Sequence, residues 1–267
     1  MKRLSATILH YGSEYLEYAL EAVNDSVDEM LILYSTNPTM GHQNRTLRNP
    51  DNRDRLKAIA DKFDKVTWID ITRSISQETV HRQMYVSYAR DHQYDQILIV
   101  DSDEVWHPDY VTPALDQAAN HDAFRVNIAG KNWFHFWKSF NEYVQDGFYP
   151  LRIINVKGQQ NREHLLDAGR IYHMGYCISN DLMRYKWSCH GHYDELNPNF
   201  LNLYENYNKK EYEQWLSGEK SLSWIPGKYI YDKVYTLHPV AREIWKQTKL
   251  FDKNELPDLL KRHPLRS

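Results

Sequence analysis

Three carboxylates follow a short apolar run in the first half of the chain. Residues 97–100 read ILIV, and Asp101, Asp103 and Glu104 come directly after them. Side chains alternate along an extended segment, so Asp101 and Asp103 should point the same way. Two like charges on one side repel each other unless a cation or a hydrogen-bond donor lies between them. A hard divalent ion, Mg²⁺ or Mn²⁺, held by carboxylates and substrate phosphates would meet this need; the alternative is an exposed acidic turn.

The elements that would position these carboxylates alternate along the first hundred residues. Apolar runs predict four strands, at residues 4–11, 29–35, 65–71 and 96–100. Three segments predict helices, at residues 13–24, 51–63 and 76–92, the first of them with Ser13 as N-cap. Such βαβ units build a mostly parallel sheet. Ligands bind beyond the carboxyl ends of parallel strands, which is where Asp101 and Asp103 would lie.

The pattern becomes mixed after residue 101. Strands are predicted at residues 123–130, 148–158 and 170–176, and helices at residues 108–120 and 179–187, the second capped by Ser179 or Asn180. The fold class is therefore α/β, with a mostly parallel central sheet flanked by helices, a mixed second half and a helical C-terminal extension. The expected boundaries are a domain at 1–205, made of a nucleotide-binding half at 1–104 and an acceptor and metal half at 105–205, and an extension at 206–267.

The segment RQMYVSYARDHQYDQILIVDSDEVW resembles the core of the GT-A type nucleotide-sugar glycosyltransferases. In that family a helix carrying an Arg and a small residue, here Arg82 and Ala89, leads into an apolar strand that ends in D-x-D. Glu104 is similar to the D-x-D-E form of the N-acetylglucosaminyltransferase-like branch, as is GRIYHMGYCISNDLMRYKWSCHGHYDE further on. The resemblance spans roughly residues 4–195. It implies a single GT-A domain that uses Mn²⁺ or Mg²⁺ to move a hexosyl or pentosyl group from a nucleotide sugar, with a UDP-sugar expected first.

The resemblance also implies roles for individual residues. The metal ligands would be Asp101, Asp103 and His173. The donor would be bound by His10, Tyr11, Arg82, Asp101 and Lys186, with Lys186 facing the diphosphate. An inverting enzyme needs a carboxylate base near the acceptor hydroxyl. The candidates are Glu163 and Asp167, just ahead of His173, and Asp194; a retaining mechanism without a dedicated base is the alternative.

An aromatic segment, KNWFHFWKSF at residues 131–140, follows one of the predicted strands. Trp133 and Trp137 could form a stacking platform for the acceptor, or they could belong to a buried strand. The acceptor could be a saccharide, a protein or lipid carrier, or a hydroxylated base in DNA. The basic end of the chain favours DNA, and the net charge of −3 argues against it.

Composition narrows the classes of protein further. The two cysteines, Cys177 and Cys189, form neither a disulfide framework nor a four-ligand zinc site, and favour a reducing, cytoplasmic compartment. No run of about 18 apolar residues predicts a membrane span.

Two other classes of protein remain as alternatives to a glycosyltransferase. A sugar-phosphate nucleotidyltransferase would need a Gly-rich basic loop after the first strand, which HYGSEY does not offer, and a non-catalytic binding module would keep the fold alone.

Overall fold

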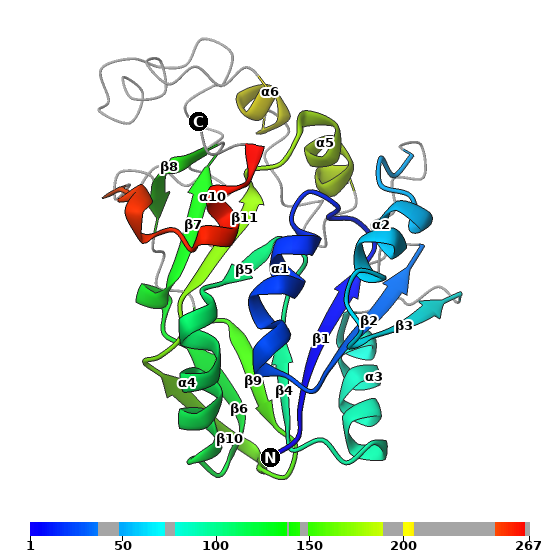
Figure 1. Ribbon diagram of the computed structural model, residues 1–267, viewed down its shortest axis with the longest axis vertical. Helices are drawn as coiled ribbons and strands as arrows, with labels where there is room; N and C mark the ends of the chain where they lie inside the picture. Colours follow the sequence, from blue (N-terminus) through cyan, green and yellow to red (C-terminus); the bar gives the residue numbers. More distant parts are fainter. Residues whose placement is uncertain are drawn as a thin grey trace.

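Two β-sheets and the helices packed against them make up the fold (Figure 1). The computed structural model describes residues 1–36, 48–72, 78–137, 139–144, 149–188, 200–205 and 249–264. Within these residues no helix has both the length and the apolar character that crossing a bilayer requires.

The larger sheet has seven strands in the order β10-β6-β9-β4-β1-β2-β3. Their bounds are β1 Arg3–Leu9, β2 Glu29–Ser35, β3 Val66–Ile71, β4 Gln96–Ile99, β6 Ala123–Ile128, β9 Leu151–Asn155 and β10 Gln159–Leu166. Strands β3, β2, β1 and β4 run parallel, as do β6 and β10, while β9 is antiparallel to both of its neighbours. The predicted α/β class with a mostly parallel sheet is confirmed.

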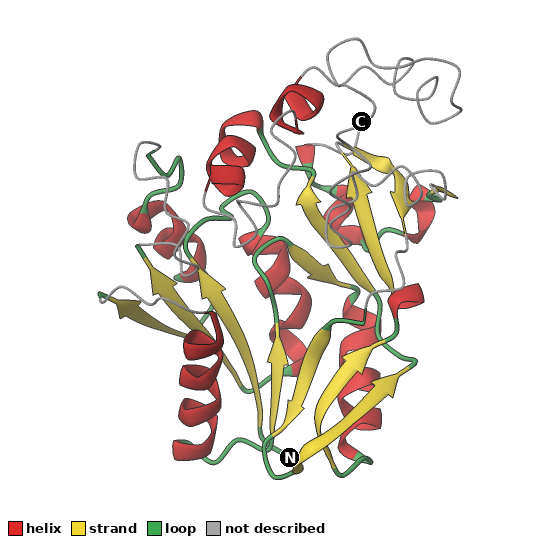
Figure 2. Ribbon diagram, turned by 180° about the vertical axis from the view of Figure 1, so that it is seen from behind, coloured by secondary structure: helices red, strands yellow, loops and turns green. Residues whose placement is uncertain are grey.

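Helices cover both faces of this sheet (Figure 2). The helices α1 (Leu16–Val23), α2 (Arg53–Ala60) and α4 (Pro108–Ala119) pack on one face, and α3 (Glu78–Asp91) packs on the other. Side chains of β4 alternate between two cores, with Leu98 in one and Ile97 and Ile99 in the other. Burial on both faces explains why this strand is a continuous apolar run.

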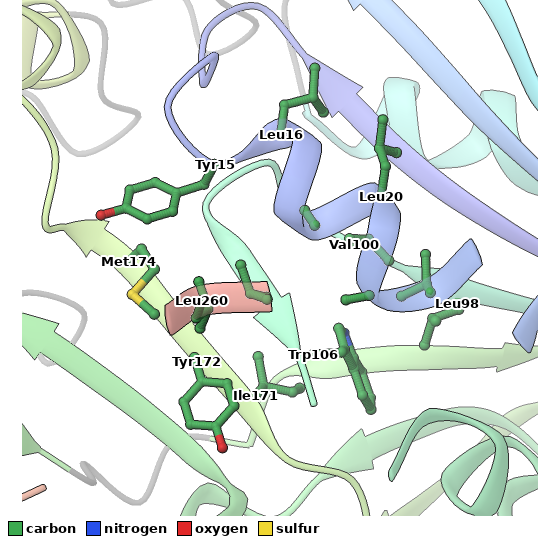
Figure 3. Packing of buried hydrophobic residues seen from close by; sticks show 14 of the residues in the cluster. Tyr15, Leu16, Leu20, Leu98, Val100, Trp106, Ile171, Tyr172, Met174 and Leu260 are labelled. Carbon is green, nitrogen blue, oxygen red and sulfur yellow. The ribbon is translucent and has the colours of Figure 1, made fainter. Parts of the chain in front are cut away.

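A second sheet continues from the end of β4, in the order β12-β8-β7-β11-β5. Its strands are β5 Glu104–Trp106, β7 Trp133–Trp137, β8 Ser139–Val144, β11 Ile171–Tyr176 and β12 Lys249–Leu250. The core is shared between the sheets, because Trp106 and Tyr172 belong to the same buried cluster as Leu16, Leu98 and Val100 (Figure 3). The 3-10 turn η2 (Gly130–Asn132) and the helices α5 (Asn180–Ser188) and α6 (Phe200–Glu205) complete this region, while the 3-10 turn η1 (Asn24–Ser26) joins α1 to β2 of the larger sheet.

The described end of the chain packs into the same core. Strand β12 pairs with β8, and the turn η4 (Lys253–Glu255) leads to the short helix α10 (Asp258–Lys261). Phe251 and Leu260 lie in the cluster that contains Leu16 of α1. This part of the predicted C-terminal extension is therefore joined to the main fold.

Two predicted helix starts had different outcomes. Ser13 is not the N-cap of α1: the helix begins at Leu16, its N-cap Tyr15 makes no side-chain cap hydrogen bond, and the Ser13 hydroxyl bonds to Asp51 instead. The buried Asp51 carboxylate also accepts from the Ser13 backbone N–H at 2.9 Å. Because the Ser13 side chain is bonded to Asp51, it does not cap the first turn of α1. At α5 the Ser179 hydroxyl accepts from the Leu182 N–H at 3.4 Å, as predicted.

Candidate active site

The D-x-D residues lie in the turn that joins the two sheets, between β4 and β5. The Ser102 hydroxyl donates to the backbone oxygen of Tyr11 at 3.0 Å, which ties this turn to the loop that follows β1. Gly12 has a φ of 124°, and a Cβ at this position would collide with the Ser102 side chain. A glycine is thus required there, and the close approach brings the loop with His10 and Tyr11 next to Asp101 and Asp103.

A buried ion pair anchors the far side of this turn. Glu104 is fully buried, and Arg152 of β9 contacts both of its carboxylate oxygens, with Nε to Oε2 at 2.7 Å. The same guanidinium donates from Nη2 to Asp101 Oδ2 at 2.9 Å. Burial raises the pKa of Glu104 to about 8, against the opposing effect of Arg152. Arg152 was not predicted as a site residue, although a lone Arg in the apolar strand LRIIN was a signal for a buried carboxylate partner.

Asp103 has its own cation, supplied by α5. The Lys186 Nζ donates to Asp103 Oδ2 at 2.8 Å and to the Gly175 backbone oxygen at 3.1 Å. Burial alone would raise the Asp103 pKa, but the charge of Lys186 and the nearby His173 hold it well below its usual range. Asp103 is therefore a carboxylate at neutral pH.

Gly175 provides the space in which this group of side chains meets. A Cβ at residue 175 would come within 2.6 Å of His173 Cε1, 2.7 Å of Lys186 Nζ and 3.0 Å of Asp103 Oδ2. Three predicted site residues, Asp103, His173 and Lys186, are thus brought together around one glycine of β11.

His173 lies on β11 between Glu104 of β5 and His135 of β7. Its ring centroid is 4.6 Å from that of His135 and 5.3 Å from that of Trp133. Its Nδ1 is buried, and the described residues offer it no hydrogen-bond partner. Burial, and then the neighbouring His135, lower the His173 pKa well below its ordinary value, so the imidazole is neutral at pH 7.

The aromatic side chains of the β1 loop lie on the same side as Lys186. The Tyr11 ring centroid is 4.6 Å from His10, 6.1 Å from Tyr185 of α5 and 6.0 Å from the Lys186 Nζ. Figure 1 shows α5 next to the loop that follows β1. Burial lowers the His10 pKa to about 4, helped by the positive charge of Lys186 and by His81. His10 is therefore a neutral ring beside Tyr11.

The predicted catalytic bases Glu163 and Asp167 are exposed and paired with surface cations. Glu163 is exposed on the edge strand β10 and pairs with Arg125 at 3.2 Å; three strand spacings, about 14 Å, separate β10 from β4. Asp167 is exposed and pairs with Lys131 at 2.5 Å, a contact that lowers its pKa. The described contacts of Asp101 and Asp103 are made instead by Arg152 and Lys186.

Four more residues were named in the sequence analysis, and the structure describes the side chains of Arg82 and Trp133. Arg82 lies partly buried on α3. Trp133 is 5% exposed, with the Arg152 guanidinium 5.5 Å from its ring centroid, so its ring packs beneath the site and presents no open stacking face. The Trp137 side chain and Asp194 lie outside the described residues.

The divalent ion that the motif predicts does not fit the side chains as they are arranged. Among the described residues, no three His, Cys, Asp or Glu side chains are grouped as metal ligands. Asp103 is paired with Lys186, and Asp101 with Arg152. With Glu104 neutral at pH 7, as its raised pKa indicates, the Asp101 and Asp103 carboxylates carry −2 and the two cations carry +2, so the cluster has no net charge. The cationic partner that the sequence requires for these carboxylates is supplied by the chain itself.

Comparisons with known proteins gave distant structural likenesses. No protein-family model matches the chain, and no curated protein matches its sequence. The solved structure of S. aureus TarS residues 1–349 has a TM-score of 0.42 at 10% identity, over 86% of this chain and 82% of that one. The same protein in complex with UDP-GlcNAc has a TM-score of 0.42 at 14% identity, over 88% and 82%.

A second type of enzyme matches less of the chain. A 4-diphosphocytidyl-2C-methyl-D-erythritol synthase has a TM-score of 0.36 at 13% identity, over 62% of this chain and 88% of that one.

Proposed function

We propose that the protein is a GT-A type glycosyltransferase that moves a sugar from a nucleoside-diphosphate sugar to a hydroxyl acceptor. The observation that carries the proposal is the group formed by Asp103, Lys186 and Gly175 at the carboxyl end of β4, next to Tyr11 at the end of β1. In parallel sheets this is the edge at which nucleotides bind. A UDP-sugar is the first donor to test.

Each part of the site has a role in this proposal. Lys186 is a compact positive charge for the diphosphate oxygens, and Asp103 holds its ammonium in place at 2.8 Å. The Asp101 side chain is 45% exposed and can accept a hydrogen bond from a ribose hydroxyl of the donor. Tyr11 and the neutral His10 flank the nucleobase.

The reaction would be a direct transfer at the anomeric carbon. The acceptor hydroxyl attacks this carbon, the bond from the carbon to the diphosphate oxygen breaks, and the hydroxyl proton passes to a base or to water. Negative charge grows on the diphosphate as the bond breaks, so the positive charge of Lys186 stabilises the transition state more than the ground state. We assign no base, since Glu163 and Asp167 are both exposed and paired with surface cations.

The first test is hydrolysis of a panel of UDP-, GDP-, CDP- and ADP-sugars, with Asp103→Asn as the site variant. We expect one donor class to release nucleoside diphosphate, and Asp103→Asn to lower kcat at least about tenfold, because Lys186 loses its charged partner. The matched control is Asp109→Asn, at an exposed carboxylate of α4, which should leave the rate unchanged. Equal rates for Asp103→Asn and the wild-type protein would refute the site, and binding of a donor with no hydrolysis or transfer would indicate a non-catalytic module.

The acceptor is tested separately. We propose a saccharide or a carrier hydroxyl, because the net charge of −3 gives no general attraction to a polyanion. Transfer to a hydroxylated base in duplex DNA would depend on phosphate contacts and would therefore fall steeply as salt rises. Transfer to such a duplex with this salt dependence would replace the saccharide proposal.

A further inference from the structure

We infer that Lys186, and not a bound divalent ion, is the cation that receives the diphosphate of the donor, so that the protein binds nucleotide without metal. The inference rests on the proposed function and concerns the same site. It is carried by the position of Lys186, by the space around Gly175 and by the charges of the cluster.

The position of Lys186 comes first. Its residue is 9% exposed, and its Nζ is 2.8 Å from Asp103 Oδ2 and 3.1 Å from the Gly175 oxygen. A Mg²⁺ or Mn²⁺ ion on that carboxylate oxygen would lie about 2.0–2.1 Å from it. Such an ion would lie beside the ammonium, and the two positive charges would repel each other, so the position of Lys186 disfavours a metal ion on this oxygen.

The space around Gly175 comes second. A Cβ at residue 175 would be 2.7 Å from Lys186 Nζ and 3.0 Å from Asp103 Oδ2. Because Gly175 has no side chain, the Lys186 ammonium can reach the Asp103 carboxylate. The space that β11 leaves in front of Asp103 is occupied by the lysine.

The charges come third. An ion in a D-x-D motif offsets the repulsion between its carboxylates, and here Arg152 and Lys186 already do so for Asp101 and Asp103. A divalent ion that displaced Lys186 would leave an ammonium without its buried counter-ion, which is strongly unfavourable. The arrangement with Lys186 on Asp103 needs no such rearrangement before the diphosphate binds.

The test measures nucleotide binding by the full chain with and without metal. UDP, GDP, CDP and ADP are titrated by calorimetry into wild-type protein, once in excess EDTA and once in excess Mn²⁺. The expected result is that one of these nucleotides binds with the same Kd, within about twofold, in both buffers. Lys186→Gln should raise that Kd at least about tenfold in EDTA, because a hydrogen bond to a charged group is lost.

The matched control is Lys157→Gln. Lys157 pairs with Asp95 at 2.6 Å, as Lys186 pairs with Asp103, but it is exposed and its partner precedes β4. Its substitution should leave the Kd unchanged. If Lys186→Gln fails to fold, as judged by circular dichroism, the wild-type comparison between EDTA and Mn²⁺ still decides the inference.

Two other outcomes separate this inference from the proposed function. Binding that requires Mn²⁺ would overturn the inference and leave the glycosyltransferase proposal intact. Failure of all four nucleotides to bind in both buffers would refute the proposed function and the inference with it.

Discussion

Replacing Gly175 with alanine tests the site with one methyl group. The new Cβ would lie 2.6 Å from His173 Cε1 and 2.7 Å from Lys186 Nζ, where ordinary contact begins at 3.4 Å. The backbone itself can accept alanine, because Gly175 is not among the glycines with positive φ. The strain therefore falls on these two side chains and on Asp103, whose Oδ2 would lie 3.0 Å from the new Cβ. The end of the lysine is the flexible one, and it must retreat by about 0.7 Å to restore contact at 3.4 Å.

A retreat of that size weakens the hydrogen bond between Lys186 and Asp103, which is 2.8 Å long. Hydrogen bonds to charged groups contribute about 1.5–3 kcal/mol, and about 1.4 kcal/mol corresponds to a tenfold change in Kd. If the diphosphate depends on the same ammonium, Gly175→Ala should weaken nucleotide binding about 10- to 150-fold. Overpacking should lower the free energy of unfolding by about 1–3 kcal/mol.

The matched control is Gly158→Ala, in the turn between β9 and β10. A Cβ there would lie 2.8 Å from the backbone of Ala123 and Phe124, which cannot move without shifting β6. This variant should lose stability at least as much as Gly175→Ala, yet bind nucleotide like the wild-type protein below its Tm. The assay is UDP titration by calorimetry, with the panel above if UDP does not bind, and thermal unfolding of both variants. Unchanged binding by folded Gly175→Ala, or equal loss of binding in the control, would refute the reasoning.

Three further predictions concern the residues around this site. Arg152→Met should lower the free energy of unfolding by about 3–5 kcal/mol, because Glu104 stays buried without its partner, and adding Glu104→Leu should recover most of the loss in urea unfolding. No recovery in the double variant would contradict this account. Trp133→Ala should cost about 3–5 kcal/mol of stability and depress donor hydrolysis and transfer together, because its ring packs against His173; a rise in the acceptor KM alone would support the acceptor platform instead. Burial lowers the His10 pKa from 6.5 to about 4, so the unfolded chain binds more protons between these values and stability should fall as pH drops through that window. His10→Gln should flatten that part of a plot of Tm against pH, and an unchanged slope would show that another group controls it.

The amino-acid sequence predicts the framework of the first half of the chain. Strands β2 and β4 are apolar on both sides because helices cover both faces of the sheet, so their apolar runs are visible without any knowledge of their partners. The sequence also predicts Asp101 and Asp103 at the end of β4, because the apolar run that forms this strand stops directly before them. Strand β10, in contrast, reads QQNREHLL and lies on an exposed edge, so its residues have no apolar pattern that could reveal it.

Which cations contact the carboxylates depends on contacts between distant parts of the chain. Arg152 is 51 residues from Asp101 and reaches it because β9 is inserted antiparallel beside β4. Lys186 is 83 residues from Asp103 and reaches it because β11 pairs with β5 and leaves only a glycine in the way. The D-x-D motif indicates that two neighbouring carboxylates need a cation. Whether a metal ion or a lysine supplies the charge depends on which strands become neighbours, and strand order is a property of the folded chain.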